Sequence, residues 1–280
     1  MQYKVTSTMQ EAGVHFGSDV NPGSMLCAIF LWMASVLLPP PAAAADSFTL
    51  GTALEDTKLY FTAPLRWDAE DWQYLGATLA AIGAAHQYDQ RVRDHFATGS
   101  YAILDGKDRN SLRDAVPAAA LIAGTWAYAG YLGDSDGFRE GWSLIEAGVL
   151  STASGEILGY AAGRERPDAT MSPNQWRQGG DSFPSLHAGA AFAIGTVFAE
   201  SGSDDYRWIR RVVGYGIAGA TAYIRVKENV HWLSDTVAGG ALGIATARFV
   251  LNRQAPASRA SLQFQPLKDG WLLSYSVNTH

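Results

Sequence analysis

Arginine, histidine and aspartate side chains recur at short spacings in the second half of the sequence. Arg225 is followed by His231 and then by Asp235, and the last two are four residues apart. On a helix this spacing places both side chains on one face, so the carboxylate can orient the imidazole. The other ring nitrogen is then exposed as a nucleophile, and a nearby guanidinium stabilises charge on the group attacked. The same pattern also suits a core pair or half of a metal site.

A second cluster, SFPSLHAGAAFAIG, occupies residues 182–195. Pro184 and Ser185 are typical of a helix start, and His187 falls in the first turn. The amides of Ser185 and Leu186, with the Ser185 hydroxyl, can bind an anion there, because a helix N-terminus carries partial positive charge. His187 is near enough to exchange a proton with that anion. The alternative interpretation is an ordinary helix cap with a surface histidine.

Two arginines follow a predicted helix in the sequence GRERP, residues 163–167. Pro167 favours an end to the helix, so Arg164 and Arg166 are expected to project into the following loop. Planar guanidinium groups suit phosphate oxygens, because each presents several donors in a fixed arrangement. The alternative interpretation is that these arginines complement the helix dipole or pair with Glu165.

Taken together, the order R-x-R-P, P-S-x-H and R-x5-H-x3-D over residues 159–235 resembles the type 2 phosphatidic acid phosphatase superfamily. That superfamily includes bacterial acid phosphatases and vanadium-dependent haloperoxidases. The resemblance implies an α-helical bundle with a site between the helices. It also implies that His231 attacks phosphorus, that His187 protonates the leaving oxygen, and that Asp235 keeps His231 in the productive tautomer.

Phosphate binding is implied by the same resemblance. Arg166 and Arg225 would bind the phosphoryl oxygens, and Ser185 and the Leu186 amide would add hydrogen bonds. Catalysis would then rest on positioning and preorganised positive charge, with no metal and no cofactor.

The sequence departs from the family pattern at three positions. Gly159 stands where the family usually has a phosphate-binding lysine, and Arg164 and Lys227 are the candidates to replace that charge. Leu186 replaces the usual glycine, and Ile224 replaces the usual serine. The leucine keeps its main-chain amide, so the change there mainly removes backbone freedom and space.

The leading hypothesis is a metal-independent phosphatase that hydrolyses a phosphomonoester or diphosphate through a phosphohistidine intermediate. The family and the apolar helices favour a lipid-linked substrate over a soluble one. One alternative is a vanadate-dependent haloperoxidase, against which the missing lysine at Gly159 argues. The other is a non-catalytic binding or scaffold protein that keeps the fold.

Composition limits the function classes further. The 280 residues are 48% hydrophobic and carry a formal net charge of −6, so no general basic field exists to bind nucleic acid. Cys27 is the only cysteine, which excludes an intrachain disulfide and a multi-cysteine zinc site. Any metal would need histidine and carboxylate ligands.

The apolar pattern predicts one helical domain over residues 46–280. Six core helices are expected, at 69–87, 111–132, 140–163, 184–201, 206–225 and 231–252. Residues 47–64 differ from this helical pattern, because they are rich in threonine and leucine. Alternating apolar and polar residues in 261–277 predict a short C-terminal β-hairpin.

The N-terminus has the pattern of a signal peptide over residues 1–45. The 14-residue apolar stretch Met25–Leu38 is short for a membrane span, and Ala43 and Ala45 offer a cleavage site. Met25 is an alternative start. We expect an exported, periplasmic protein, soluble or in peripheral membrane contact, because only residues 115–133 form an uncharged stretch near spanning length. The alternative is an inner-membrane protein.

Overall fold

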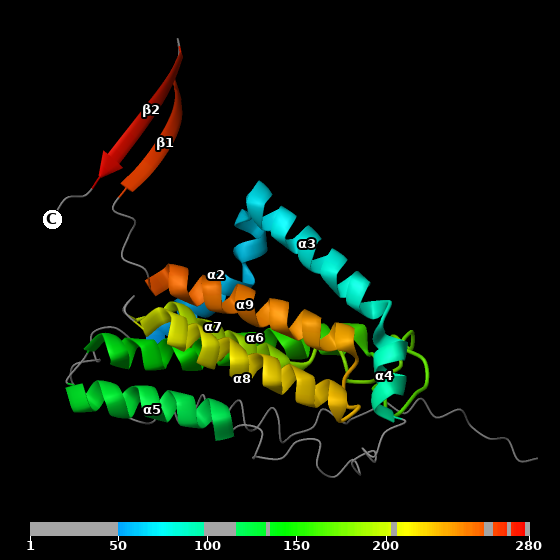
Figure 1. Ribbon diagram of the computed structural model, residues 1–280. Helices are drawn as coiled ribbons and strands as arrows, with labels where there is room; N and C mark the ends of the chain where they lie inside the picture. The colour runs from blue at the N-terminus through cyan, green and yellow to red at the C-terminus, as the bar shows by residue number, and fades with distance from the viewer. Residues whose placement is uncertain are drawn as a thin grey trace, which may run out of the picture.

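The computed structural model describes residues 50–97, 116–132, 135–202, 206–254, 260–267 and 270–277. Eight α-helices occupy these ranges and form an all-α bundle, with a β-hairpin following them (Figure 1). The helices are α2 (Leu50–Phe61), α3 (Ala69–His86), α4 (Asp89–Ala97), α5 (Val116–Leu132), α6 (Ser135–Ala162), α7 (Leu186–Glu200), α8 (Arg207–Lys227) and α9 (Leu233–Gln254), with a 3-10 turn η2 (Ala63–Arg66) between α2 and α3.

The six predicted helices are confirmed as α3 and α5–α9, with ends that differ by a few residues. The predicted start of α5, residues 111–115, lies outside the described residues, as does the predicted signal peptide, residues 1–45. Two further helices, α2 and α4, were not predicted. Threonines weaken the intrinsic helix propensity of α2, and α4 has only nine residues, most of them charged or polar, which is too little for a clear apolar period.

Helix α2 is fixed by tertiary contacts at Tyr60. Its ring packs edge-on against Phe249 of α9 with centroids 5.2 Å apart. Its hydroxyl lies 2.7 Å from the Thr246 hydroxyl and accepts a hydrogen bond from Ser154 of α6 at 3.1 Å. Tertiary packing therefore outweighs the weak intrinsic helix propensity of this segment.

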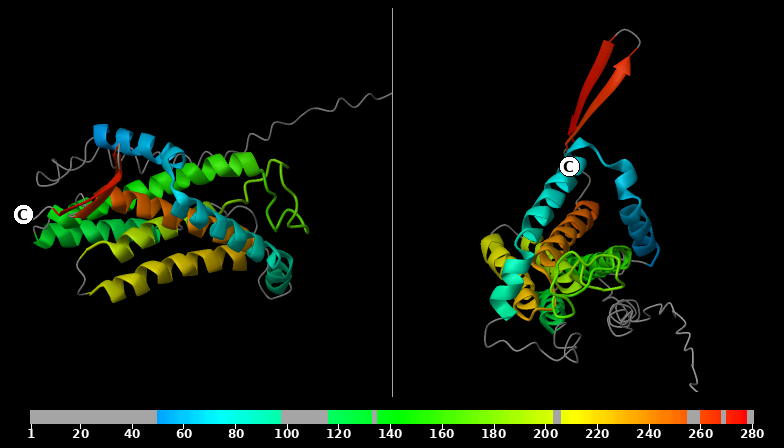
Figure 2. Two further views of the ribbon diagram at one scale, coloured as in Figure 1. Left: turned by 90° about the horizontal axis from the view of Figure 1, so that it is seen from above. Right: turned by 90° about the vertical axis from the view of Figure 1, so that its right-hand side faces the viewer.

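Helix α7 lies at the centre of the bundle and contacts α6, α8 and α9 (Figures 1 and 2). The hydrophobic core forms where these helices meet. It includes Leu144 and Leu150 of α6, Val197 of α7 and Val250 of α9, all buried. The core thus holds together the helices that carry the sequence motifs.

Glycines allow α7 to approach its neighbours closely. A Cβ atom on Gly195 would lie 2.6 Å from the main-chain oxygen of Gly214 in α8, closer than real Cβ contacts permit. Gly239 of α9 faces the main-chain oxygen of Ser185, again with no room for a Cβ atom. The main chains of α7 and α9 are therefore in direct contact just where α7 begins.

Within the described ranges, none of the helices combines the length and apolar character needed to cross a membrane. The uncharged stretch at residues 115–133 corresponds to the 17-residue helix α5.

The C-terminal hairpin is present as expected. Strands β1 (Ala260–Leu267) and β2 (Gly270–Val277) are antiparallel, with Ala260 opposite Val277 and Leu267 opposite Gly270. The hairpin projects away from the helices in Figure 1 and in the right-hand view of Figure 2.

Candidate active site

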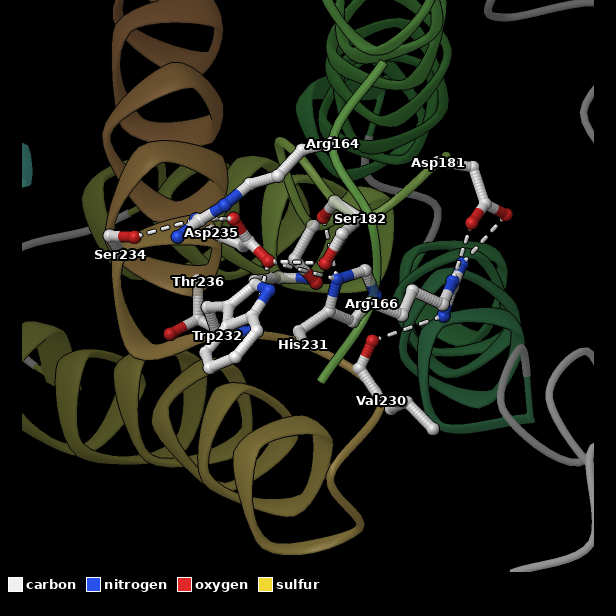
Figure 3. Close-up of polar contacts among 12 residues, drawn as sticks. Arg164, Arg166, Asp181, Ser182, Val230, His231, Trp232, Ser234, Asp235 and Thr236 are labelled. Atoms are coloured by element: carbon white, nitrogen blue, oxygen red, sulfur yellow. Dashed lines mark hydrogen bonds and ion pairs between the residues drawn. The ribbon is translucent and has the colours of Figure 1, made fainter. Parts of the chain in front are cut away.

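The three sequence clusters meet at one end of the bundle (Figure 3). The loop from residue 163 to 185 joins α6 to α7, and it runs against the turn between α8 and α9. The Ser182 carbonyl contacts His231 in that turn, and the Ser185 amide donates to the Asp235 carbonyl at 3.0 Å. Motifs that are about 50 residues apart in sequence therefore share one site.

His231 is held in a single tautomer. The residue is 4% exposed, and Nδ1 lies 2.7 Å from the main-chain oxygen of Ser182. A carbonyl oxygen only accepts, so Nδ1 carries the proton and Nε2 keeps its lone pair. Burial, reinforced by the nearby charge of Arg166, lowers the pKa of His231 to about 4. The ring is therefore neutral at pH 7, as a nucleophile requires.

The expected contact between Asp235 and His231 is replaced by an indirect one. Oδ2 of Asp235 is 3.9 Å from Nδ1 of His231, beyond hydrogen-bond distance. Instead, Asp235 accepts from the Ser182 hydroxyl at 2.5 Å, from the Trp232 amide at 2.9 Å and from Arg164. The carboxylate thus holds the loop whose carbonyl orients the imidazole, because that carbonyl belongs to Ser182.

Arg164 occupies a position unlike the one expected for a phosphate ligand. Its side chain is fully buried, and all three guanidinium nitrogens donate to groups of the protein. Besides Asp235, the acceptors are Asp89 at 2.7 Å, the Ser234 hydroxyl at 2.8 Å and the Pro173 carbonyl. Because all three guanidinium nitrogens donate to groups inside the protein, Arg164 does not supply the positive charge of the lysine that the family pattern has at position 159.

Asp89, at the start of α4, completes this buried network and was missed in the sequence analysis. One carboxylate oxygen accepts from the Ser234 amide at 2.8 Å, and the other accepts from the Ser234 hydroxyl at 2.6 Å. His86 contacts the same carboxylate through Nδ1 at 2.8 Å. A carboxylate at the N-terminus of α9 stabilises that helix end, and here it joins α4 to α9.

Arg166 is at the accessible edge of the site. Its Nε and Nη2 donate to the two carboxylate oxygens of Asp181 at 2.6 and 2.9 Å, and Nη1 donates to the Val230 carbonyl at 3.3 Å (Figure 3). Asp181 is 62% exposed. Partial burial raises the pKa of Asp181, but hydrogen bonds and charge from Arg166 outweigh it and lower the pKa overall. Asp181 is a second site residue that the sequence did not reveal.

Arg225 lies in the last turn of α8, beside the turn that carries His231. Its main-chain oxygen accepts from the amides of Val230 and His231, which fixes the turn that presents the imidazole. Its guanidinium is buried and pairs with Glu228 at 2.8 Å. The structure therefore brings the main chain of Arg225 to the site, while its guanidinium pairs with Glu228.

The start of α7 is capped as predicted. Ser185 is the N-cap residue, and its hydroxyl accepts from the Ala188 amide at 3.4 Å. The Ser185 amide donates to Asp235, so it is committed to the protein and not to an anion. His187 follows in the first turn, half-buried, and its charge is among those that lower the pKa of His231.

Gly159 faces the loop that leads into α7. A Cβ atom built on this residue would lie 3.3 Å from the main-chain oxygen of Phe183. A side chain at position 159 would therefore begin next to the residues before Ser185. Among the described residues, no group of three or more histidine, cysteine, aspartate or glutamate side chains could hold a metal ion.

Part of this chain is similar to a known protein family and to a known phosphatase. Residues 140–259 match the family described as the PAP2 superfamily. A stretch of 85 residues is 38% identical to a lipid A 1-phosphatase of Porphyromonas gingivalis, covering 30% of this chain and 17% of that protein. The matched stretch is thus a small part of its relative.

Among solved structures, the chain is similar to the crystal structure of a transmembrane PAP2-type phosphatidylglycerolphosphate phosphatase from Bacillus subtilis. That comparison has a TM-score of 0.39 and 15% sequence identity, over 83% of this chain and 98% of the other.

Proposed function

Residues 140–259 of this chain belong to the PAP2 superfamily, and on that premise we propose that the protein is a phosphoric ester hydrolase. Its substrate is a phosphomonoester or diphosphate, and its nucleophile is His231. The observation that carries this proposal is the Nδ1 contact to the Ser182 carbonyl, which leaves Nε2 unprotonated in a neutral, buried ring.

In the first step, Nε2 of His231 forms a bond to phosphorus while the bond from phosphorus to the leaving oxygen breaks. His187 donates a proton to that oxygen. Arg166 and Arg225 hold the phosphoryl oxygens and stabilise the charge that develops on them. In the second step, His187 removes a proton from water, the resulting oxygen bonds to phosphorus, and the bond from nitrogen to phosphorus breaks.

The buried hydrogen-bond network around Asp235 acts by holding the imidazole of His231 in place. Asp235, held by Arg164, fixes Ser182, and Ser182 fixes the imidazole. No group of this network needs to touch the substrate. We therefore assign Asp235 and Arg164 as positioning residues, and Ser185 and Leu186 as residues that shape the start of α7 beside the phosphate.

A lipid-linked phosphate is the proposed substrate class. Support comes from the similarity to the lipid A 1-phosphatase of Porphyromonas gingivalis. We further propose export through a signal peptide at residues 1–45, which would place residues 46–280 in the periplasm as one phosphatase-type domain.

The test is phosphate release by the purified protein from soluble and lipid phosphates, compared with the variant His231→Ala. We expect that variant to lose essentially all turnover, while His95→Ala, which removes an exposed histidine outside the site, retains it. His187→Ala should still be phosphorylated by an aryl phosphate with an acidic phenol, because that leaving group needs no proton. Halide oxidation on adding vanadate, without phosphate release, would instead favour the haloperoxidase alternative.

A further inference from the structure

His86, the last residue of α3, lies at the edge of the buried network and takes no part in the steps proposed above. Nδ1 of its imidazole is 2.8 Å from Oδ2 of Asp89, and Nε2 is 2.9 Å from Oδ1 of Asn174. A carboxylate and an amide oxygen both accept hydrogen bonds, so each ring nitrogen faces an acceptor. Both contacts are hydrogen bonds at the same time only when both nitrogens carry protons, which is the imidazolium form.

Arg164 lies close to the same ring nitrogen but does not need it as an acceptor. Its Nη2 is 3.1 Å from Nδ1 of His86, whereas the two protons of Nη2 have nearer acceptors in Oδ2 of Asp89, at 2.7 Å, and the Pro173 carbonyl, at 2.8 Å. The Nδ1 proton therefore points at Asp89, whose Oδ2 accepts from both the guanidinium and the imidazole. Among the described residues, Asp89 and Arg164 are the charged groups in contact with the ring.

The charges of the network balance when His86 is protonated. Asp89 and Asp235 are fully buried carboxylates, and both accept from the single guanidinium of Arg164. These three groups carry a net charge of −1, and an uncompensated charge in the protein interior is costly. An imidazolium at His86 brings the net charge to zero. Its side chain is 25% exposed, so the ring can exchange its proton with water.

His86 also contacts the loop from residue 163 to 185, which carries the carbonyl that orients the nucleophile. Asn174 belongs to this loop. Trp176, two residues later, packs against the imidazole with ring centroids 6.3 Å apart. The same indole meets Phe183 edge to face, with centroids 5.3 Å apart, and Phe183 directly follows the residue that supplies the carbonyl. The loop is therefore in contact with His86 at two residues.

We propose that His86, as an imidazolium, is a positioning residue for His231. The inference rests on the proposed function, in which His231 is the nucleophile. When His86 is neutral, two carboxylates share one cation, which weakens the hold of Arg164 on Asp235. Because Asp235 fixes Ser182, and Ser182 fixes the imidazole of His231, the rate of attack on phosphorus should fall as His86 loses its proton.

Nitrogen-15 NMR of the protein labelled at histidine tests the protonation state directly. At pH 6, both ring nitrogens of His86 should carry protons, while His231, with its pKa of about 4, should carry one on Nδ1. His86→Gln identifies the His86 signals by their loss, and in this variant His231 should populate both tautomers. A single proton on His86 at pH 6, or an unchanged His231 tautomer in the variant, would overturn the proposal.

The pH dependence of kcat for p-nitrophenyl phosphate gives a second measurement. In the wild-type protein, kcat should fall on the alkaline side as His86 loses its proton. His86→Gln should remove this alkaline fall and lower kcat about tenfold, because a small displacement of the nucleophile is enough for such a loss. KM should stay nearly the same, since Arg166 is unchanged. His95→Gln, which alters an exposed histidine of α4, is the control and should behave like the wild-type protein.

A second variant covers the case in which His86→Gln fails to fold, as judged by its thermal unfolding. Asn174 is exposed, and Asn174→Asp places a charged acceptor beside Nε2, so the alkaline fall should move up by about half a pH unit. Gln178→Glu adds the same charge at an exposed residue of the same loop and should not move it. A fall that stays in place in Asn174→Asp, or moves equally in both variants, would overturn the proposal. Absence of His231-dependent turnover on every phosphate would instead overturn the proposed function, and the NMR result would still decide the role of His86.

Discussion

The imidazole of His231 is oriented by a main-chain oxygen, that of Ser182, 2.7 Å from Nδ1. A main-chain acceptor does not titrate, so the tautomer of His231 does not depend on the protonation state of a partner carboxylate. Asp235 contributes to this orientation indirectly, because it accepts a hydrogen bond from the Ser182 hydroxyl. The orientation of the nucleophile thus depends on the path of the loop from residue 163 to 185.

The low pKa of His231 predicts a loss of stability on acidification. Its pKa is about 4 in the folded chain and about 6.5 when unfolded, so between these values the unfolded state binds more protons. The free energy of unfolding should therefore fall by up to about 3 kcal/mol from this residue as pH drops from 6.5 to 4. Urea unfolding at pH 7, 5.5 and 4.5 measures this, and His231→Gln should show a shallower dependence. Parallel curves for the two proteins would contradict the assignment.

Asp181 is expected to compete with phosphate for Arg166. Because both carboxylate oxygens accept from the guanidinium, an incoming phosphate must displace them. Asp181→Asn removes the charge and should tighten competitive inhibition by inorganic phosphate by up to about fivefold, the range expected for a half-exposed ion pair. Asp56→Asn, which breaks a similar pair with Arg253, is the control and should change nothing. An unchanged or weaker inhibition in Asp181→Asn would show that the pair does not oppose binding.

Removing the buried charge of Asp89 should destabilise the fold strongly. An asparagine has one acceptor oxygen where the carboxylate has two, so its amide would face a donor of Ser234 or Arg164. We expect Asp89→Asn to lower the free energy of unfolding by about 3–5 kcal/mol. Denaturant unfolding measures this. Asp56→Asn, which weakens a partly exposed ion pair with Arg253, is the comparison and should lose less than about 1 kcal/mol. A loss as small as that of the control would contradict the importance of the network.

Gly159→Lys should add the charge that the family pattern places at this position. The Cβ atom would face Phe183, so the side chain starts beside the loop leading to His187. Inhibition by vanadate should tighten by about 1 kcal/mol, as for one partly solvated charge-assisted contact. Gly159→Met, of similar length without charge, separates this effect from packing. Equal vanadate affinity in the two variants would mean that Lys227 or another cation already serves the site.

The sequence was sufficient to predict the long helices and the convergence of the motifs. Apolar residues recur clearly along α6–α9. The helical spacing of His231 and Asp235 was only partly right, because His231 lies in the turn before α9 and contacts the Ser182 carbonyl in place of Asp235. The role of Arg164 was not predictable, because R-x-R does not indicate which guanidinium faces the interior. That choice depends on Asp89, 75 residues earlier on a short polar helix, and only the tertiary structure places the two 2.7 Å apart.

The helical glycines of the bundle differ in whether alanine can replace them without moving a neighbouring helix. Gly216 and Gly219 of α8 have no heavy atom near a would-be Cβ, so alanine there should stabilise the helix by about 0.5–1 kcal/mol each. At Gly239 the same routine substitution would force α9 away from Ser185. Because α7 carries His187 and α9 follows directly from His231, one added methyl group would widen the space between the two histidines. A thermostable variant built by replacing every helical glycine would therefore lose the alignment of its reacting groups.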